Sequence, residues 1–223
     1  MAIAFAAADG NAQTAANPTT YSPTGGLIVG QRHILCMRVA TATVTSVTDN
    51  GGNTYTQIGY LNNTGWGYQV YAFDAVISTA ATVVTMNYSA VPSASPKAHS
   101  YRATGANSSV AAQLAGQYIA VSTVITDAIT SGNLTPAAQP GLLIGWCSLS
   151  GGANTATPGT GFTDRGEITA GQHERYEDKA ISSVSAVAAT FTASLAGAAT
   201  VFGIYLQEAA AAVGQSSRVV FIG

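Results

Sequence analysis

Short segments in which apolar and polar residues alternate constrain the fold of this chain more than any other feature. The clearest are residues 44–48, 68–73 and 83–88. Val, Thr and Tyr recur in them, as a pleated and half-buried surface favours, and alternation with a period of two indicates β-strands. Gly- and Asn-rich turn segments such as 49–53 lie between them. Many short strands at this spacing predict an all-β fold, an antiparallel two-sheet β-sandwich that is jelly-roll-like. We expect no helix longer than two turns.

A weak internal repeat organises the strands into two halves. The matching segments are 26–30 and 141–145, 53–56 and 161–163, 68–74 and 173–178, 81–86 and 188–193, and 98–102 and 202–206. Each half thus holds about five strands in the same order and would leave an apolar sheet face open on its own. We expect residues 1–208 to form one domain in which the halves seal each other's inner faces. Two separate small sandwiches are the alternative.

The composition argues against several classes of partner. Ala, Thr, Gly and Ser make up about half of the chain, and charged residues are 8% of it, against roughly 25% in an average soluble domain. The formal net charge of −2 offers no attractive field for nucleic acid. The apolar stretches end well short of the ~20 residues of a membrane span. The first residues lack the basic region of a signal peptide. We therefore expect synthesis in a cytoplasm and neither nucleic-acid nor membrane partners.

No sequence motif for catalysis, a cofactor or a metal is recognisable. The chain has no Gly-x-Ser-x-Gly elbow, no phosphate loop and no Cys-x-x-Cys pair. The segment Asp49–Asn53 has the composition of a calcium loop but lacks the later bidentate Glu, so we interpret it as a turn. The histidines are far apart, and Cys36 and Cys147 lie in apolar runs where we expect buried, reduced thiols. We expect no enzyme activity, no cofactor and no metal site.

Charged residues gather in one segment. Eight of the eighteen lie between Asp164 and Lys179. Alternation places Glu174, Tyr176 and Asp178 on one face of a strand. The two carboxylates could form a cation site or an acid pair. The interspersed Arg175 favours instead an exposed edge strand protected by charges of both signs.

Aromatic residues cluster around positions 62–67. Trp66, between two glycines, is expected at a loop tip, and Tyr71 is expected in the core. Trp66 and Tyr68 are the candidate glycan contacts, because exposed rings can stack on sugars and also anchor interfaces.

The C-terminal part, residues 209–223, reads as an Ala-rich linker and an extra strand beyond the repeat. Its apolar end is expected to contact a neighbouring subunit. The alternative is that this end covers an edge of its own sheet. The candidate interface residues are Arg218, Val219, Val220, Phe221 and Ile222.

Several segments of residues 1–206 together match a known pattern. They are the start Met-Ala-Ile-Ala, Gly26–Val29, the block Ser46–Thr56 (Ser-Val-Thr-Asp-Asn-Gly-Gly-Asn-Thr-Tyr-Thr), Ala81–Ser89, Leu142–Gly145 and Gly161–Thr163. In these the chain resembles a loosely defined family of stand-alone β-sandwich proteins from phages and environmental bacteria. It departs from the family at Tyr101–Gly105. The resemblance implies the fold and a virion or cell-surface setting, and it implies no catalytic residues.

The leading functional expectation is a phage virion structural protein, most simply a capsid decoration or cement protein located in the virion and made in the host cytoplasm. A surface with few charges favours dry, self-complementary contacts, so the expected partners are copies of itself, for example in a trimer, and the major capsid protein or other virion proteins. The alternative is a carbohydrate-binding, receptor-binding module of a tail fibre or bacterial surface. A hydrolase is the last choice.

Overall fold

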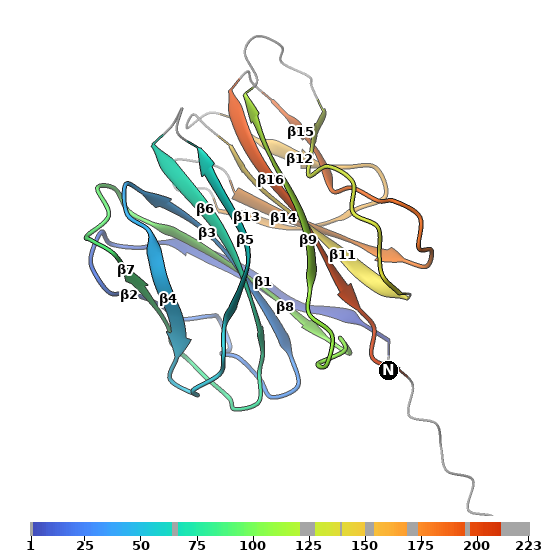
Figure 1. The fold of residues 1–223 in the computed structure, drawn as a ribbon, viewed down its shortest axis with the longest axis horizontal. Helices are drawn as coiled ribbons and strands as arrows, with labels where there is room; N and C mark the ends of the chain where they lie inside the picture. The colour runs from blue at the N-terminus through green and yellow to red at the C-terminus, as the bar shows by residue number, and fades with distance from the viewer. Residues whose placement is uncertain are drawn as a thin grey trace, which may run out of the picture.

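The computed structural model describes residues 2–63, 67–120, 128–138, 140–149, 154–168, 174–194 and 197–210. These residues form β-strands and no helix, arranged in four antiparallel sheets (Figure 1). The predicted all-β antiparallel sandwich is confirmed. No helix in the described part of the chain could span a membrane.

The first half of the chain contains eight strands. They are β1 (Ala4–Ala12), β2 (Thr19–Tyr21), β3 (Arg32–Ala40), β4 (Val44–Asp49), β5 (Thr56–Asn63), β6 (Tyr68–Val76), β7 (Val84–Tyr88) and β8 (Lys97–Thr104). They build a five-stranded sheet in the order β1-β8-β3-β6-β5 and a three-stranded sheet in the order β2-β7-β4. The predicted strands at 44–48, 68–73 and 83–88 correspond to β4, β6 and β7.

The second half repeats the first strand for strand. Its strands are β9 (Gln113–Ala120), β10 (Ala128–Thr130), β11 (Gly141–Leu149), β12 (Ala156–Pro158), β13 (Thr163–Ile168), β14 (Glu174–Ile181), β15 (Thr190–Ala193) and β16 (Ala198–Gln207). The sheet orders β9-β16-β11-β14-β13 and β10-β15-β12 are those of the first half. Each half is thus a two-sheet sandwich of eight strands with a jelly-roll-like strand order, and the chain is a tandem of two such sandwiches.

The internal repeat is therefore real, with two differences from the predicted one. Each half has eight strands in two sheets, where about five strands were expected. The match of 26–30 to 141–145 is wrong, because Gly26–Gly30 precedes β3 whereas Gly141–Gly145 begins β11. Both segments share only a Gly-apolar-Gly pattern. The other four matches fall on β5 and β13, β6 and β14, β7 and β15, and β8 and β16.

Three apolar layers hold the molecule together. The two five-stranded sheets face each other, and their shared core contains Ile34 and Tyr101 from the first half and Trp146, Tyr176 and Phe202 from the second. A second core lies between the two sheets of the first half, and further clusters lie between those of the second. The two five-stranded sheets thus cover each other's faces, and each half is also a two-sheet sandwich of its own.

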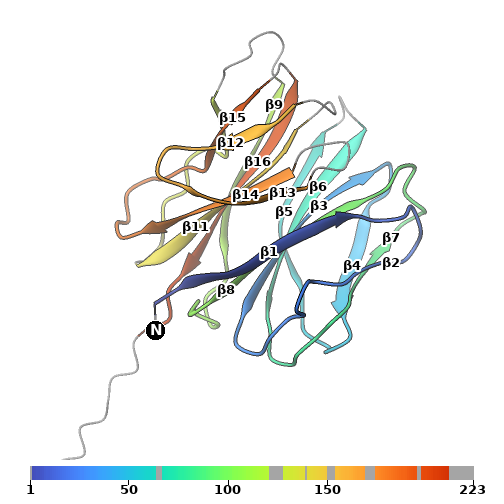
Figure 2. The same ribbon diagram turned by 180° about the vertical axis from the view of Figure 1, so that it is seen from behind.

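Strands of the two halves pack against each other along both sides of the junction. Strand β1 packs against β13, and β5 packs against β9. Figure 2 shows β1 running across the molecule along this junction. The central strands of both five-stranded sheets are consequently covered on both faces, and all nine residues of β3 and of β11 are buried.

Candidate functional site

Most of the described charged residues of this protein are buried or half-buried. Asp127 and Arg218 are outside the described residues, and of the other sixteen charged residues only Asp164 and Lys179 are exposed. Charged side chains are almost never fully buried unless they are paired. Half of the sixteen are buried, namely Arg32, Arg38, Asp74, Lys97, Arg102, Glu174, Glu177 and Asp178.

The strand that carries Glu174, Tyr176 and Asp178 is not an exposed edge, and that prediction is wrong; the edge strand of this sheet is β13. Strand β14 lies between β13 and β11. Glu174, Tyr176 and Asp178 do share one face, and it is the face that packs against the first half. Sequence spacing could not show this, because Arg38 and Tyr101, which contact these carboxylates from the first half, lie more than seventy residues away in the chain.

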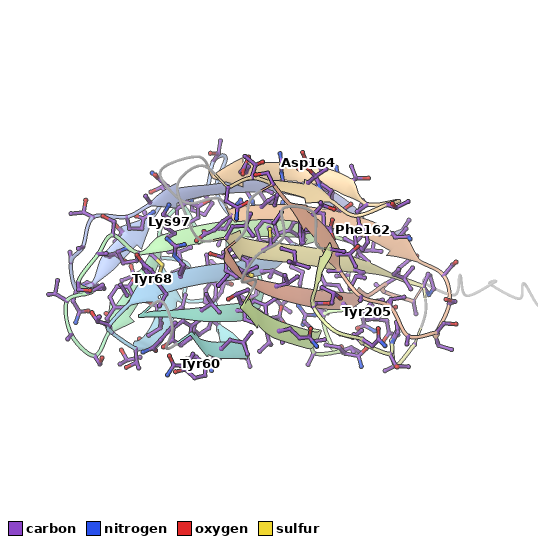
Figure 3. All side chains as sticks on the ribbon, turned by 90° about the horizontal axis from the view of Figure 1, so that it is seen from above. Tyr60, Tyr68, Lys97, Phe162, Asp164 and Tyr205 are labelled. Atoms are coloured by element: carbon purple, nitrogen blue, oxygen red, sulfur yellow. The ribbon has the colours of Figure 1, made fainter. Side chains whose placement is uncertain are left out.

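Glu174 joins a polar cluster at one end of the junction. Its Oε1 lies 3.8 Å from Arg38 Nε, and Ser148 Oγ donates to it at 3.4 Å. Burial raises the pKa of Glu174 and lowers the pKa of Lys97, whose own charge interacts with this carboxylate. The Arg38 guanidinium also lies 4.4 Å from the centre of the Tyr68 ring. Tyr68 and Lys97 are labelled in Figure 3.

Asp178 belongs to a separate group of contacts. It accepts hydrogen bonds from Tyr101 Oη and, at 2.6 and 3.0 Å, from Arg165 Nε and Nη2. The Arg165 guanidinium lies 4.0 Å from the centre of the Phe5 ring. Glu174 and Asp178 thus engage different arginines and do not share a cation. Among the described residues no group of three or more His, Cys, Asp and Glu side chains could hold a metal ion.

A buried hydrogen-bond chain resembles a catalytic relay in composition. Ser100 Oγ lies 2.9 Å from His33 Nε2, Tyr55 Oη lies 2.9 Å from His33 Nδ1, and Tyr55 donates to Asp49 at 3.3 Å. Ser100 and His33 are fully buried, so a substrate could not reach the hydroxyl without opening the sandwich. Burial lowers the pKa of His33 to about 3, which makes it a poor base near neutral pH. The chain of bonds supports a structural role.

The turn at Asp49–Asn53 is confirmed as a turn. Asp49 Oδ1 accepts from the backbone N–H groups of Gly51 and Asn53 at 3.0 Å. Asn53 in turn accepts from the N–H groups of Ser78 and Thr79. A side chain at Gly51 would meet the Ala80 carbonyl at 2.8 Å. The Asp49 carboxylate and the Asn53 amide therefore accept hydrogen bonds from backbone N–H groups of two neighbouring loops, and they do not form a cation site.

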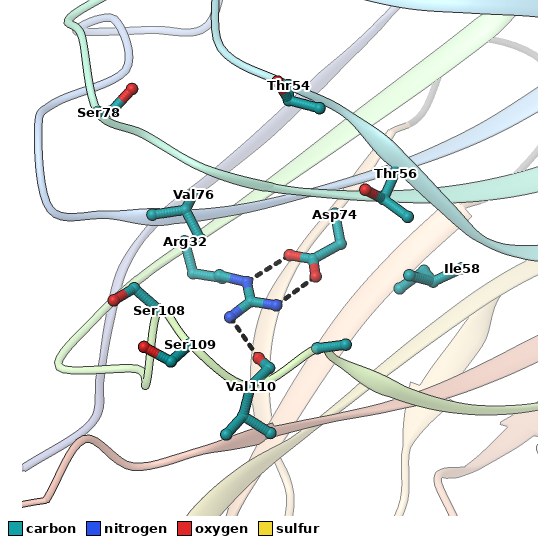
Figure 4. Close-up of a pocket in the computed structure, with 11 residues that line it drawn as sticks. Arg32, Thr54, Thr56, Ile58, Asp74, Val76, Ser78, Ser108, Ser109 and Val110 are labelled. Carbon is teal, nitrogen blue, oxygen red and sulfur yellow. Dashed lines mark hydrogen bonds and ion pairs between the residues drawn. The ribbon is translucent and has the colours of Figure 1, made fainter.

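An open cavity of about 400 Å³ lies beside another buried ion pair (Figure 4). Arg32 and Asp74, 5% and 6% exposed, form two side-chain hydrogen bonds with each other. Arg32 Nη1 also donates to the carbonyls of Asn107 and Val110 at 2.7 and 2.8 Å. The pair thus anchors the segment that connects the two halves. Hydroxyl groups surround it, from Thr54, Thr56, Ser78, Ser108 and Ser109.

Sequence reasoning missed this cavity. Its walls come from the starts of β3 and β5, the end of β6 and the connecting segment, which no motif links. The available signal was a charge inside an apolar strand. Asp74 lies within Tyr-Ala-Phe-Asp-Ala, and Arg32 opens a strand that is otherwise mostly apolar.

The other predicted site residues have varied positions. Tyr71 is buried as expected. Tyr68 is half-buried, and Arg38 covers one face of its ring. Trp66 and the segment Arg218–Ile222 lie outside the described residues. Cys36 and Cys147 are buried free thiols, as predicted.

Comparison with known proteins adds no relative. No family model, no curated protein and no solved structure matches the chain.

Proposed function

We propose that this protein is a structural component of a phage virion, most simply a capsid decoration or cement protein that acts through subunit contacts. One observation carries the proposal, the small number of fully exposed charged residues. Only Asp164 and Lys179 of the sixteen described charged residues are exposed. Charged side chains are depleted from the cores of protein interfaces, and surface charge keeps proteins apart in solution. Removing water from a neutral surface rich in Thr, Ser and Gly costs less free energy than removing it from a charged surface.

The architecture is compatible with this role. Jelly rolls occur in viral capsid and lectin domains, and three apolar layers suit a protein that must persist outside cells. A fold does not by itself define a function, so the surface carries the argument and the fold supports it.

Quantitative mass spectrometry of purified virus particles tests the proposal. Particles from a culture of the phage that encodes the chain should contain it in stoichiometric amounts, with a high copy number for a capsid location and a low one for a tail. Recovery of the protein only from the cell lysate, and none from washed particles, would contradict a virion role.

The C-terminal part gives a second test. Deletion of residues 209–223 should leave a folded chain with weakened assembly or particle attachment, because the apolar segment Arg218–Ile222 is proposed to contact a neighbour. Unfolding of the truncated chain would assign this segment to its own core. Unchanged attachment would exclude it from the interface.

Carbohydrate binding is the second candidate function, and the hydroxyl-lined cavity beside Arg32 and Asp74 favours it. The aromatic contacts expected at Trp66 and Tyr68 are a different site, and Arg38 already occupies one face of Tyr68. A Trp66→Ala chain that loses glycan-array signal would support the aromatic site, and an unchanged signal would exclude Trp66.

A further inference from the structure

We propose that the cavity beside the Arg32–Asp74 pair is a binding site for a neutral sugar ring. The inference concerns the second candidate function and is independent of the virion role. The cavity lies at the Val76 end of β6, whereas Tyr68 begins this strand. Eight residue steps separate the two ends, roughly 26 Å in an extended strand, so this site is distinct from any contact at Tyr68.

The floor of the cavity is polar and electrically neutral. Arg32 and Asp74 neutralise each other, and both side chains are more than nine-tenths buried. No unpaired cation is left there to attract a phosphate or sulfate, and no unpaired carboxylate is left to hold a metal ion. The chemistry of the floor therefore selects an uncharged ligand.

The ion pair still has hydrogen-bonding capacity. Arg32 carries five N–H donors, and four are engaged, two by Asp74 and two by backbone carbonyls. Asp74 accepts from Arg32 and from the Ala112 N–H group, out of about four lone-pair positions. One Arg32 N–H and at least one Asp74 lone pair are thus not used by these bonds, and both residues line the cavity. Two neighbouring hydroxyl groups of one ligand would match this remaining donor and acceptor.

The walls complete the match to a sugar. The hydroxyls of Thr54, Thr56 and Ser108 have no side-chain hydrogen bond in the described structure and are free to pair with a ligand. Ile58 and Val76 add apolar surface, which suits the C–H face of a sugar ring. The volume of about 400 Å³ falls within the range of roughly 300–1,000 Å³ of small-molecule sites. Figure 4 shows these side chains around the ion pair.

Titration of the full chain with single sugars tests the site. The probes are glucose, galactose, mannose and N-acetylglucosamine, followed by the backbone amide NMR signals of residues 108–111. We expect saturable shifts with at least one sugar and a dissociation constant on the order of 1 mM, because hydrogen bonds at an open rim exchange with water for little net gain. Inorganic phosphate should cause no saturable shift.

Three variants define the location. Thr56→Trp should fill the cavity and weaken binding about tenfold or more, and Thr56→Val should weaken it about fivefold, the effect of one net hydrogen bond. Thr192→Trp is the matched control, because Thr192 is an exposed strand residue of the second half, and it should bind as the native chain does. Three results would each overturn the proposal: no saturable shift with any of the four sugars, binding that survives Thr56→Trp, or phosphate binding of similar strength.

Discussion

At the residue scale, the Arg32–Asp74 pair fixes the segment that joins the halves. Replacing Arg32 with Met should leave Asp74 buried without its counter-charge and should free the carbonyls of Asn107 and Val110. Breaking a buried pair in this way costs about 3–5 kcal/mol. Urea unfolding measures the loss, with Lys179→Met as an exposed control expected within about 0.5 kcal/mol.

The double variant Arg32→Met with Asp74→Leu sharpens this prediction. It removes both charges, so it should recover a large part of the stability lost in the single variant. A single variant with native stability would show that the pair does not hold the connecting segment.

Buried titratable groups predict how stability depends on pH. Burial raises the pKa of Glu177 to about 8, so between about pH 4.5 and 8 the folded chain holds a proton that the unfolded chain releases, and stability falls as the pH rises. Burial lowers the pKa of His33 and of His99 to about 3. Between about pH 6.5 and 3 the unfolded chain binds these protons, and stability falls as the pH drops. Maximum stability should lie near about pH 6.

Glu177→Gln tests the alkaline side of this profile. In the native chain the N–H groups of Gly159 and Thr190 donate to different carboxylate oxygens. The amide has a single acceptor oxygen, so it can keep only one of these bonds, and it cannot ionise. The variant should be less stable at acid pH, and its decline in stability toward about pH 8 should be shallower. Urea unfolding at several pH values gives the slope, and a slope equal to the native one would contradict the assignment to Glu177.

At the element scale, alternation predicted two strands that have one covered face, β4 and β7, and one strand that is buried on both faces, β6. β4 and β7 lie in a three-stranded outer sheet, and their period of two is visible in the sequence. β3 and β11 are buried on both faces, which removes the alternation. β1 is rich in Ala and gives little signal. The charged residues of β14 suggested an exposed edge strand. Their partners on β3 and β8 belong to the other half, and the sequence does not show how the two halves pack.

Strand β4 has an unusually open edge. Among the described strands it pairs only with β7, and it contains no Lys, Arg or Pro, the residues that commonly protect edges. β2, β10 and β12, the other outer edges, have three residues each. We expect β4 to take part in contacts between copies, and Thr48→Lys should weaken self-association in sedimentation velocity. Thr192→Lys, on the central strand β15, is the control. Equal effects of the two lysines would rule out a specific role of the β4 edge.

At the scale of the whole molecule, the shared core should make the two halves unfold together. Trp146, Tyr176 and Phe202 pack against Ile34 and Tyr101 of the first half, and all are fully buried. Calorimetry should therefore show one transition whose calorimetric and van't Hoff enthalpies agree. Two resolved transitions would show that each half folds on its own.

The repeat was visible in the sequence, and the way in which the halves join was not. Four of five matched segments fall on equivalent strands, because turns and apolar positions recur locally. The cavity and the polar cluster at the junction combine residues from several strands of the chain. Their positions depend on how the sheets pack, and no local pattern encodes that.

The self-association of the full chain tests the central claim most directly. A surface with two exposed charges among the described residues should assemble through uncharged contacts, which salt screens little. Light scattering with size-exclusion chromatography, at low and high salt, should give a discrete multimer of unchanged mass. A monomer at concentrations up to about 100 μM, or a multimer that dissociates as salt rises across a Debye length of about 30 to 3 Å, would contradict it.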